Sequence, residues 1–125
     1  MKKKNGMKAA LVAVLCAGML CTGCGGKEKN SNINEGMTAI EELRYEDALA
    51  CFDKALVSGE DKRLIFRGQG LANLGLARYA EAAAGLEQCL SSGSCIPDAM
   101  DYDVNYYLAT AYYKAGRPED AKKVY

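Results

Sequence analysis

Residues that could carry out chemistry are few in this chain. The 125 residues include 16 acidic side chains and six cysteines but no histidine. Without histidine, neither a Ser-His nor a Cys-His nucleophilic pair can form. The acidic pairs Glu46-Asp47 and Asp101/Asp103 leave a general acid–base pair open, but solvated helix faces and helix starts explain them equally simply. We therefore predict no catalytic residue and no enzymatic activity.

Metal and cofactor sites are also not expected. Asp98, Asp101 and Asp103 are spaced as loop oxygen ligands could be, but they lack the glycine and the distal glutamate of a calcium loop. The chain has no CxxC motif that would favour a zinc site. No glycine-rich phosphate loop is present either. The sequence predicts neither a metal nor a cofactor.

The cysteines divide into an N-terminal group and a group in the rest of the chain. Cys51 and Cys89 fall on apolar stripes of predicted helices, where cysteine behaves as a small buried hydrophobe. Cys95 lies in a predicted loop. A Cys89–Cys95 disulfide and three free thiols are the two alternatives for this group. The N-terminal cysteines are Cys16, Cys21 and Cys24.

The N-terminal segment has the pattern of a signal peptide. Residues 1–8 carry four lysines and no acid, and residues 9–20 are apolar throughout. Twelve helical residues reach about 18 Å, well short of a hydrocarbon core of about 30 Å. The segment therefore fits a signal-peptide core better than a transmembrane helix. A small residue, Gly23, precedes Cys24, as processing at this cysteine requires.

The sequence Leu20-Cys21-Thr22-Gly23-Cys24 resembles the lipobox of bacterial lipoproteins. That family usually has Leu three residues before the cysteine, where this chain has Cys21 and places Leu20 one step further out. The resemblance implies that residues 1–23 are removed and that Cys24 carries a diacylglycerol, which anchors the protein to a membrane. Residues 24–32 are then the lipidated cysteine and a flexible tether. The alternative is an ordinary cleaved signal with an incidental thiol at Cys24.

Charge limits the partners of the mature protein. Four of the 16 basic residues lie in residues 1–23, which leaves 12 basic against 16 acidic residues and a net charge of −4. This balance argues against nucleic acid and against electrostatic docking on anionic lipid.

The rest of the chain repeats. Tyr45 and Ala48 correspond to Tyr79 and Ala82 at a spacing of 34 residues, and Gly36 corresponds to Gly70 at the same spacing. A third unit appears as Pro118-Glu119-Asp120-Ala121, preceded by Leu108, Ala109, Tyr112 and Gly116. It is displaced by 39 residues from the second, so the loop at 91–101 carries about five extra residues.

This period, together with a helix–turn–helix unit, resembles the tetratricopeptide repeat (TPR) family. The resemblance covers residues 33–125 as about 2.5 to 3 repeats, and it implies an all-α fold in a short right-handed solenoid. Small residues such as Gly36 and Gly70 let paired helices approach closely. The chain departs from the family pattern at Asn32 and Asn105, where a large apolar residue is usual. It departs again at Leu43 and Ala77, which replace the turn glycine that Gly116 keeps.

The predicted helices span residues 33–42, 45–57, 62–76, 79–90 and 99–115, and a sixth begins at 118. The sixth helix is short, so one apolar face of the last pair is left uncovered. Repeat proteins normally close such an end with a capping helix. We expect the domain to be incomplete at its C-terminus. The alternatives are a frayed natural end and an open end that a partner covers.

In the TPR family the first helix of each pair lines a concave surface that binds partners. Aromatic and Arg side chains at such positions suit a protein or peptide partner. Leu71 and Leu74 have the alternative role of inter-repeat core. Only Arg67 and Lys114 could act as clamps on a peptide carboxylate, so clamping is not predicted. The groove positions that the resemblance implies are Asn34, Met37, Glu41, Arg67, Leu71, Leu74, Tyr106, Thr110, Tyr113 and Lys114.

The function that these observations predict is a membrane-anchored, non-catalytic scaffold for protein–protein interaction in the bacterial cell envelope. Its place would be the extracytoplasmic face of the cell membrane, or the outer membrane in a host that has one. One alternative is an anchored module of a longer protein whose C-terminal part is enzymatic or solute-binding. Another is an envelope-assembly subunit that docks through its open C-terminal end.

Overall fold

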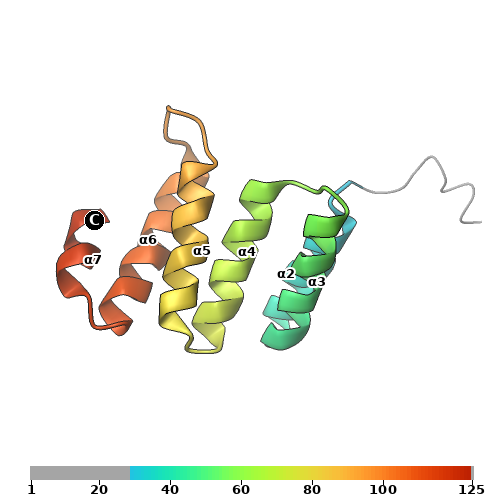
Figure 1. Ribbon diagram of the computed structural model, residues 1–125, viewed down its shortest axis with the longest axis horizontal. Helices are drawn as coiled ribbons and strands as arrows, with labels where there is room; N and C mark the ends of the chain where they lie inside the picture. Colours follow the sequence, from blue (N-terminus) through green and yellow to red (C-terminus); the bar gives the residue numbers. More distant parts are fainter. Residues whose placement is uncertain (1–28, 125) are drawn as a thin grey trace, which may run out of the picture.

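The computed structural model describes residues 29–124, and every regular element in this range is an α-helix (Figure 1). The described part of the chain is thus all-α, as predicted. The predicted signal peptide at residues 1–23, the predicted lipidation site Cys24 and Tyr125 lie outside the described residues. No helix within 29–124 is long and apolar enough to span a bilayer. The helices are α2 (Ser31–Glu41), α3 (Tyr45–Val57), α4 (Lys62–Gly75), α5 (Tyr79–Ser91), α6 (Ala99–Lys114) and α7 (Pro118–Val124).

The predicted helix boundaries agree with these to within two residues, and the largest difference is at the first helix. Helix α2 begins at Ser31, so residues 30–32 belong to the fold, and the prediction that they are tether is wrong. Helix α2 begins this early because the carboxylate of Glu60, distant in the sequence, binds its N-terminus. Glu60, in the turn between α3 and α4, accepts hydrogen bonds from the backbone N–H of Ile33 at 3.0 Å and from the Asn32 side chain at 2.7 Å. It satisfies donors that a helix N-terminus otherwise leaves unpaired, and this contact explains the polar residue at position 32.

Three helix pairs follow one another along the molecule, α2 with α3, α4 with α5 and α6 with α7 (Figure 1). The second helix of each pair also contacts the first helix of the next pair. The first helices α2, α4 and α6 touch in sequence, whereas α3, α5 and α7 make no contact with one another within the described residues. The first helices therefore form the more closely packed side of the stack.

The turns inside the three pairs have the same backbone geometry. Leu43, Ala77 and Gly116 all have positive φ, at 61°, 60° and 82°. After each of them, the next backbone N–H reaches back five residues, as Arg78 N–H does to the Asn73 carbonyl at 2.8 Å. This is the Schellman arrangement that closes a helix C-terminus. The same geometry at spacings of 34 and 39 residues confirms the registration of the repeat.

The interior forms two hydrophobic clusters. The first centres on Phe52 of α3 and is closed by Ile65 and Ala72 of α4. The second centres on Leu86 of α5 and is closed by Val104 and Leu108 of α6. Each cluster is completed only when the first helix of the next pair packs onto it.

The helices of the first two pairs approach closely at Gly36 and Gly70, the positions at which the sequence predicted close contact. A Cβ added at Gly36 would lie 2.7 Å from the Phe52 ring, and one added at Gly70 would lie 2.6 Å from Leu86. Both distances are too short for a real side chain. The structure confirms that these two positions require glycine for packing within their pairs.

Candidate partner-docking site

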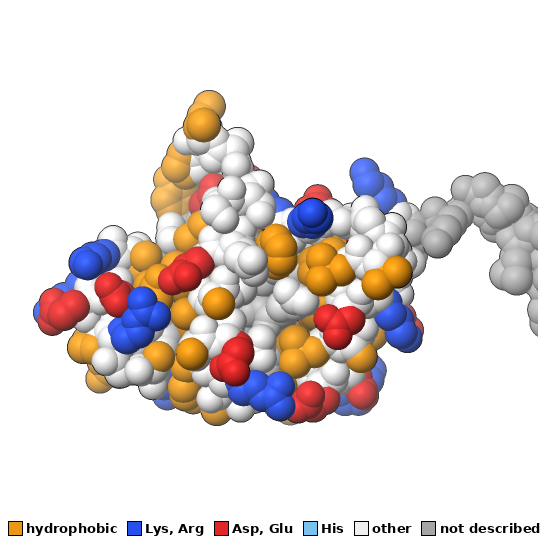
Figure 2. Space-filling view, viewed as in Figure 1, with side chains coloured by type: hydrophobic (Ala, Val, Ile, Leu, Met, Phe, Trp, Pro, Cys, Tyr) orange, Lys and Arg blue, Asp and Glu red, His pale blue; other side chains and the backbone are white. Residues whose placement is uncertain are grey.

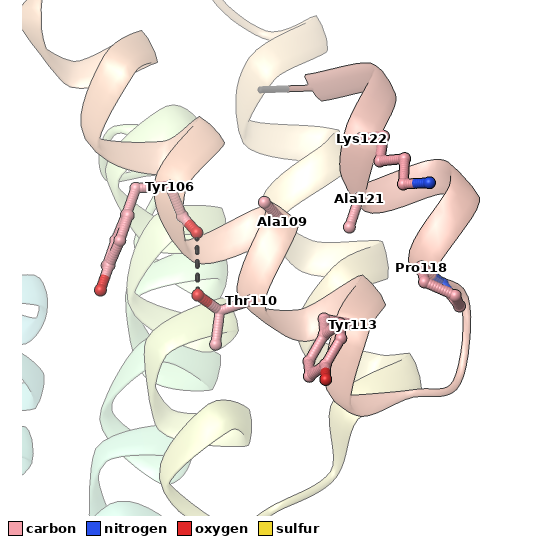
Figure 3. A pocket seen from close by; sticks show the side chains of 7 residues that line it. All are labelled: Tyr106, Ala109, Thr110, Tyr113, Pro118, Ala121 and Lys122. Carbon is pink, nitrogen blue, oxygen red and sulfur yellow. Dashed lines mark hydrogen bonds between the residues drawn. The ribbon is translucent and has the colours of Figure 1, made fainter.

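A pocket of about 490 Å³ opens between α6 and α7 at the C-terminal end of the stack (Figure 3). Its wall is almost entirely apolar. Ala109 of α6 and Ala121 of α7 both line the pocket, one from each helix. The lining residues are Tyr106, Ala109, Thr110, Tyr113, Pro118, Ala121 and Lys122.

Local sequence explains why α7 lies where it does. Gly116 supplies the positive φ of the turn, and Pro118 begins α7 at a position that favours proline. Arg117 stacks its guanidinium over the ring of Tyr112 at 4.4 Å. Tyr112 in turn donates its hydroxyl hydrogen bond to Glu87 of α5. The turn is thus tied to both helices of the core behind it.

Burial affects the chemistry of that tyrosine. Desolvation, reinforced by the hydrogen bond to Glu87, raises the pKa of Tyr112 to about 12. The phenol therefore keeps its proton to a higher pH than an ordinary tyrosine and stays the donor to Glu87.

The pocket rim is aromatic and weakly basic. Tyr106 is 54% exposed and Tyr113 is 68% exposed, which is high for aromatic rings beside an apolar wall. Lys122 lines the pocket and no acidic residue does. Figure 2 shows hydrophobic side chains interspersed with charges over this end of the molecule.

The structure brings only part of the predicted groove together. Tyr106, Thr110 and Tyr113 line the pocket, and Lys114 is exposed at the end of the same helix. Asn34 and Glu41 lie on α2, at the other end of the stack.

The remaining predicted groove positions already have structural contacts. Met37 is half-buried against the first core, and Leu74 is packed against the second. Leu71 is half-buried. Arg67 pairs with Asp103 of α6 at 2.5 Å, so its guanidinium links two repeats. The alternative interpretation of Leu74 as inter-repeat core is confirmed.

Four lining residues were not predicted: Ala109, Pro118, Ala121 and Lys122. Each corresponds by the repeat spacing to a residue of an earlier pair, as Pro118 corresponds to Tyr79 and Tyr45. The prediction missed Pro118, Ala121 and Lys122 because it placed the groove on the first helices alone, and these three lie on α7. Ala109 lies on the first helix α6 but was not among its predicted groove positions.

The acidic cluster at 98–103 has a structural role. Asp98 caps α6 and, with Asp101, holds the guanidinium of Arg63 at 2.7–3.0 Å. The hydrogen bonds from Arg63 lower the pKa of Asp98 to about 2. Asp103 is paired with Arg67. All three carboxylates thus pair with arginines of α4 and fasten α6 to it.

Cys51, Cys89 and Cys95 are free thiols. Of the two alternatives raised by the sequence, the Cys89–Cys95 disulfide is not formed. Cys89 is buried in the second core, and desolvation raises the pKa of its thiol. Cys95 is exposed in the loop that projects between α5 and α6 (Figure 1).

Comparison with known proteins gave no match to a protein family model, a curated protein sequence or a solved structure.

Proposed function

We propose that the protein is a TPR-like, lipid-anchored scaffold that binds another protein at the outer face of a bacterial membrane. It performs no chemistry of its own. The observation that carries the binding role is the apolar pocket between α6 and α7, with Tyr106 and Tyr113 exposed beside it. Exposed aromatic side chains around an apolar pocket are typical of binding hot spots.

The TPR-like solenoid is supported by the internal geometry. The three pairs share one turn geometry, and their first helices pack closely while their second helices stay apart. This asymmetry favours a stack that curves around its first helices. The pocket then lies at one end of the inner surface.

The membrane anchor is supported by the sequence around Cys24 and requires its own test. A Cys24→Ser variant is expected to lose the acyl chains and to leave the membrane fraction, whereas a Cys95→Ser variant stays there. Partition into detergent and the mass of the N-terminal proteolytic peptide measure both properties. Membrane retention of Cys24→Ser with an unmodified N-terminus would contradict the anchor.

Binding can be tested with two matched tyrosines of α6. Tyr113 is 68% exposed beside the pocket, and Tyr102 is 70% exposed but outside it. The protein is extracted from membranes in detergent with its partners and compared with Tyr113→Ala and Tyr102→Ala variants by quantitative mass spectrometry. We expect a specific partner to be depleted at least about fivefold with Tyr113→Ala and unchanged with Tyr102→Ala. Equal recovery from both variants would contradict a binding role for the pocket.

A second candidate function, docking of an envelope-assembly subunit through the open end, is favoured by the position of this pocket. The pocket lies on the last helix pair rather than along all three first helices. The scaffold and the envelope-assembly subunit would therefore both bind a partner at this pocket. They differ in how far the bound partner extends along the stack toward α2.

A further inference from the structure

The connection between α5 and α6, at residues 92–98, has an apolar tip that is not packed into either core. This connection is longer than the equivalent one at 58–61 between α3 and α4. Cys95, Ile96 and Pro97 are all exposed, and Ile96 is 77% exposed. The loop projects beyond the helices (Figure 1), and hydrophobic side chains gather at its tip (Figure 2). The tip is therefore available to a surface outside the protein.

Contacts within the protein hold this loop in its projecting shape. The Ser94 hydroxyl donates to the Ile96 carbonyl at 2.8 Å and accepts from the Ile96 N–H at 3.3 Å. At the end of the loop, Asp98 accepts a hydrogen bond from Arg63 of α4 at 2.9 Å. Near its start, Gly93 lies against the same guanidinium, and a Cβ added there would be 3.2 Å from Arg63 Nε. One arginine thus holds both ends of the loop.

The loop shares one edge of the stack with the N-terminus of α2. The backbone N–H of Asp61 donates to the Asn30 side chain at 3.1 Å, so the residue before α2 adjoins the 58–61 turn. Helix α4 begins directly after this turn, and its Arg63 contacts the loop. We call this continuous edge the tether edge. It comprises Asn30, the 58–61 turn, the start of α4 and the 92–98 loop.

The predicted lipid anchor is close to the tether edge along the chain. Cys24 precedes Asn30 by six residues, and six residues span at most about 20 Å. A lipid on Cys24 would therefore keep the tether edge near the bilayer surface, at a high effective concentration. The opposite edge, which carries the turns at Leu43, Ala77 and Gly116, is one helix length away (Figure 1). Helix α6, with 16 residues, is about 24 Å long.

The chemistry of the tether edge suits the interface of a bilayer. Val57, at the end of α3, is 90% exposed. The aspartates of this edge are already bonded, since Asp61 caps α4 and Asp98 pairs with Arg63. Lys62 is exposed at the start of α4. Apolar side chains beside lysines are typical of segments that lie in the headgroup region of a bilayer.

We propose that the tether edge rests on the lipid bilayer, with Ile96 inserted into the headgroup region and Val57 next to the surface. This proposal rests on the anchor at Cys24 that the proposed function includes, and it adds an orientation. One exposed isoleucine is too weak to hold a protein on lipid, so the contact forms only while the anchor keeps the edge nearby. Tyr113, close to the opposite end of α6, then lies away from the bilayer and stays accessible to a protein.

The lipid surface that fits this edge is uncharged overall. Residues 24–125 include 12 basic and 16 acidic side chains, so an anionic membrane would repel the protein as a whole. Zwitterionic phosphatidylcholine vesicles are therefore the appropriate probe.

A single tryptophan can report the contact, because the chain has none. Ile96→Trp places it at the loop tip, and Leu43→Trp places it on the opposite edge as a matched control, since Leu43 is 69% exposed. Protein whose acylation at Cys24 has been verified by mass is bound to phosphatidylcholine vesicles with and without brominated acyl chains. We expect brominated lipid to quench Ile96→Trp at least about twofold and Leu43→Trp less than about 1.2-fold, because bromine quenches tryptophan only in contact with lipid.

A second reporter isolates the contribution of Ile96. Val57→Trp places the tryptophan on the tether edge and leaves the loop tip unchanged. We expect its quenching to fall by at least about half when Ile96→Asp is added, and to stay the same when Leu43→Asp is added. Both added substitutions are at exposed sites, and circular dichroism verifies that each variant is folded.

The outcomes separate the orientation from the anchor. Equal quenching at positions 96 and 43, or none at 96 while Cys24 is acylated, overturns the orientation and leaves the anchor standing. An unchanged Val57→Trp signal after Ile96→Asp is added overturns the role of Ile96. If native protein from membranes has no acyl chain on Cys24, the anchor fails and the orientation fails with it.

Discussion

Single residues determine the turns of this protein, and two of them do so under strain. Leu43 and Ala77 adopt left-handed backbone geometry, with φ of 61° and 60°. A side chain in this conformation costs roughly 1–2 kcal/mol, which glycine avoids. The third pair has Gly116 at the aligned position, with φ of 82°. The chain therefore contains its own comparison between strained and unstrained versions of one turn.

The Ala77→Gly variant is expected to be more stable than the wild type by about 0.5–1 kcal/mol, since it relieves the left-handed strain at a small cost in unfolded-state entropy. The control is Ala50→Gly, at an exposed site inside α3, which should lose about 0.5–1 kcal/mol. Urea unfolding followed by circular dichroism measures both. Destabilisation by Ala77→Gly to the level of the control would contradict this account of the turn.

The interface between repeats depends on Gly68. A Cβ at this position would overlap the Phe52 ring, whereas the core of the next pair centres on the smaller Leu86. Gly68→Ala is expected to destabilise the protein by about 1–3 kcal/mol through overpacking, despite a better helix propensity. Urea unfolding measures this loss.

The double variant Gly68→Ala/Phe52→Leu tests this cause. Its loss of stability should be smaller than the sum of the two single losses, because a leucine at position 52 leaves room for the added methyl group. Additive losses in chemical denaturation would show that the ring is not what excludes alanine.

At the scale of elements, charged contacts at helix starts hold successive pairs in register. Glu60 caps α2 from a distant turn, and Asp98 caps α6 while binding Arg63 of α4. The cap of α6 by Asp98 is local, but the pairings of Glu60 with α2 and of Asp98 with Arg63 do not follow from the sequence, because these partners lie 27 and 35 residues apart. The aspartates at 98–103 do act as a group, and arginines of α4 are their partners.

The cap at Asp98 gives stability a defined dependence on pH. Its pKa is lowered from the usual 3.8 to about 2 in the folded state, so its ionised form stabilises the fold above about pH 4. That contribution is lost as pH falls from about 4 toward 2. The Asp98→Asn variant should therefore be less stable than wild type at about pH 6. The difference in stability between the two proteins should shrink as the pH falls from about 4 toward 2. Thermal unfolding at about pH 6, 4 and 2.5 measures it.

Ser91→Asn, an exposed site without an ion pair among the described contacts, serves as the control for general effects of substitution. A gap between wild type and Asp98→Asn that stayed constant down to about pH 2.5 would exclude the carboxylate as its source.

At the scale of the whole molecule, the sequence predicted the helices well and the site only in part. Periods of 34 and 39 residues defined three pairs, since small and aromatic residues recur where helices cross. The pocket was half predicted. Tyr106, Thr110 and Tyr113 lie on α6 as expected, but the α7 wall depends on how the last turn folds back. Arg67 was predicted to face a partner, and its pairing with Asp103, 36 residues away, has no signal in the repeat pattern.

The two ends of the stack are unlike in chemistry. The outward positions of α2 include the polar Ser31 and Thr38, whereas the last pair presents an apolar pocket rimmed by tyrosines. With the proposed anchor at Cys24, a stack with one polar end and one apolar end would be suited to hold a partner at a fixed side. We therefore expect a partner to bind at the apolar end.

The most direct test is a photo-crosslinking amino acid placed at Tyr113 in living cells, with the same substitution at Tyr102 as the matched control. Both sites are exposed on α6, but only Tyr113 lines the pocket. We predict a discrete crosslinked protein from position 113 and none from position 102, and its loss when Thr110→Arg is added. Identical crosslinks from both positions, or none from position 113, would contradict the claim that this end of the molecule binds a partner.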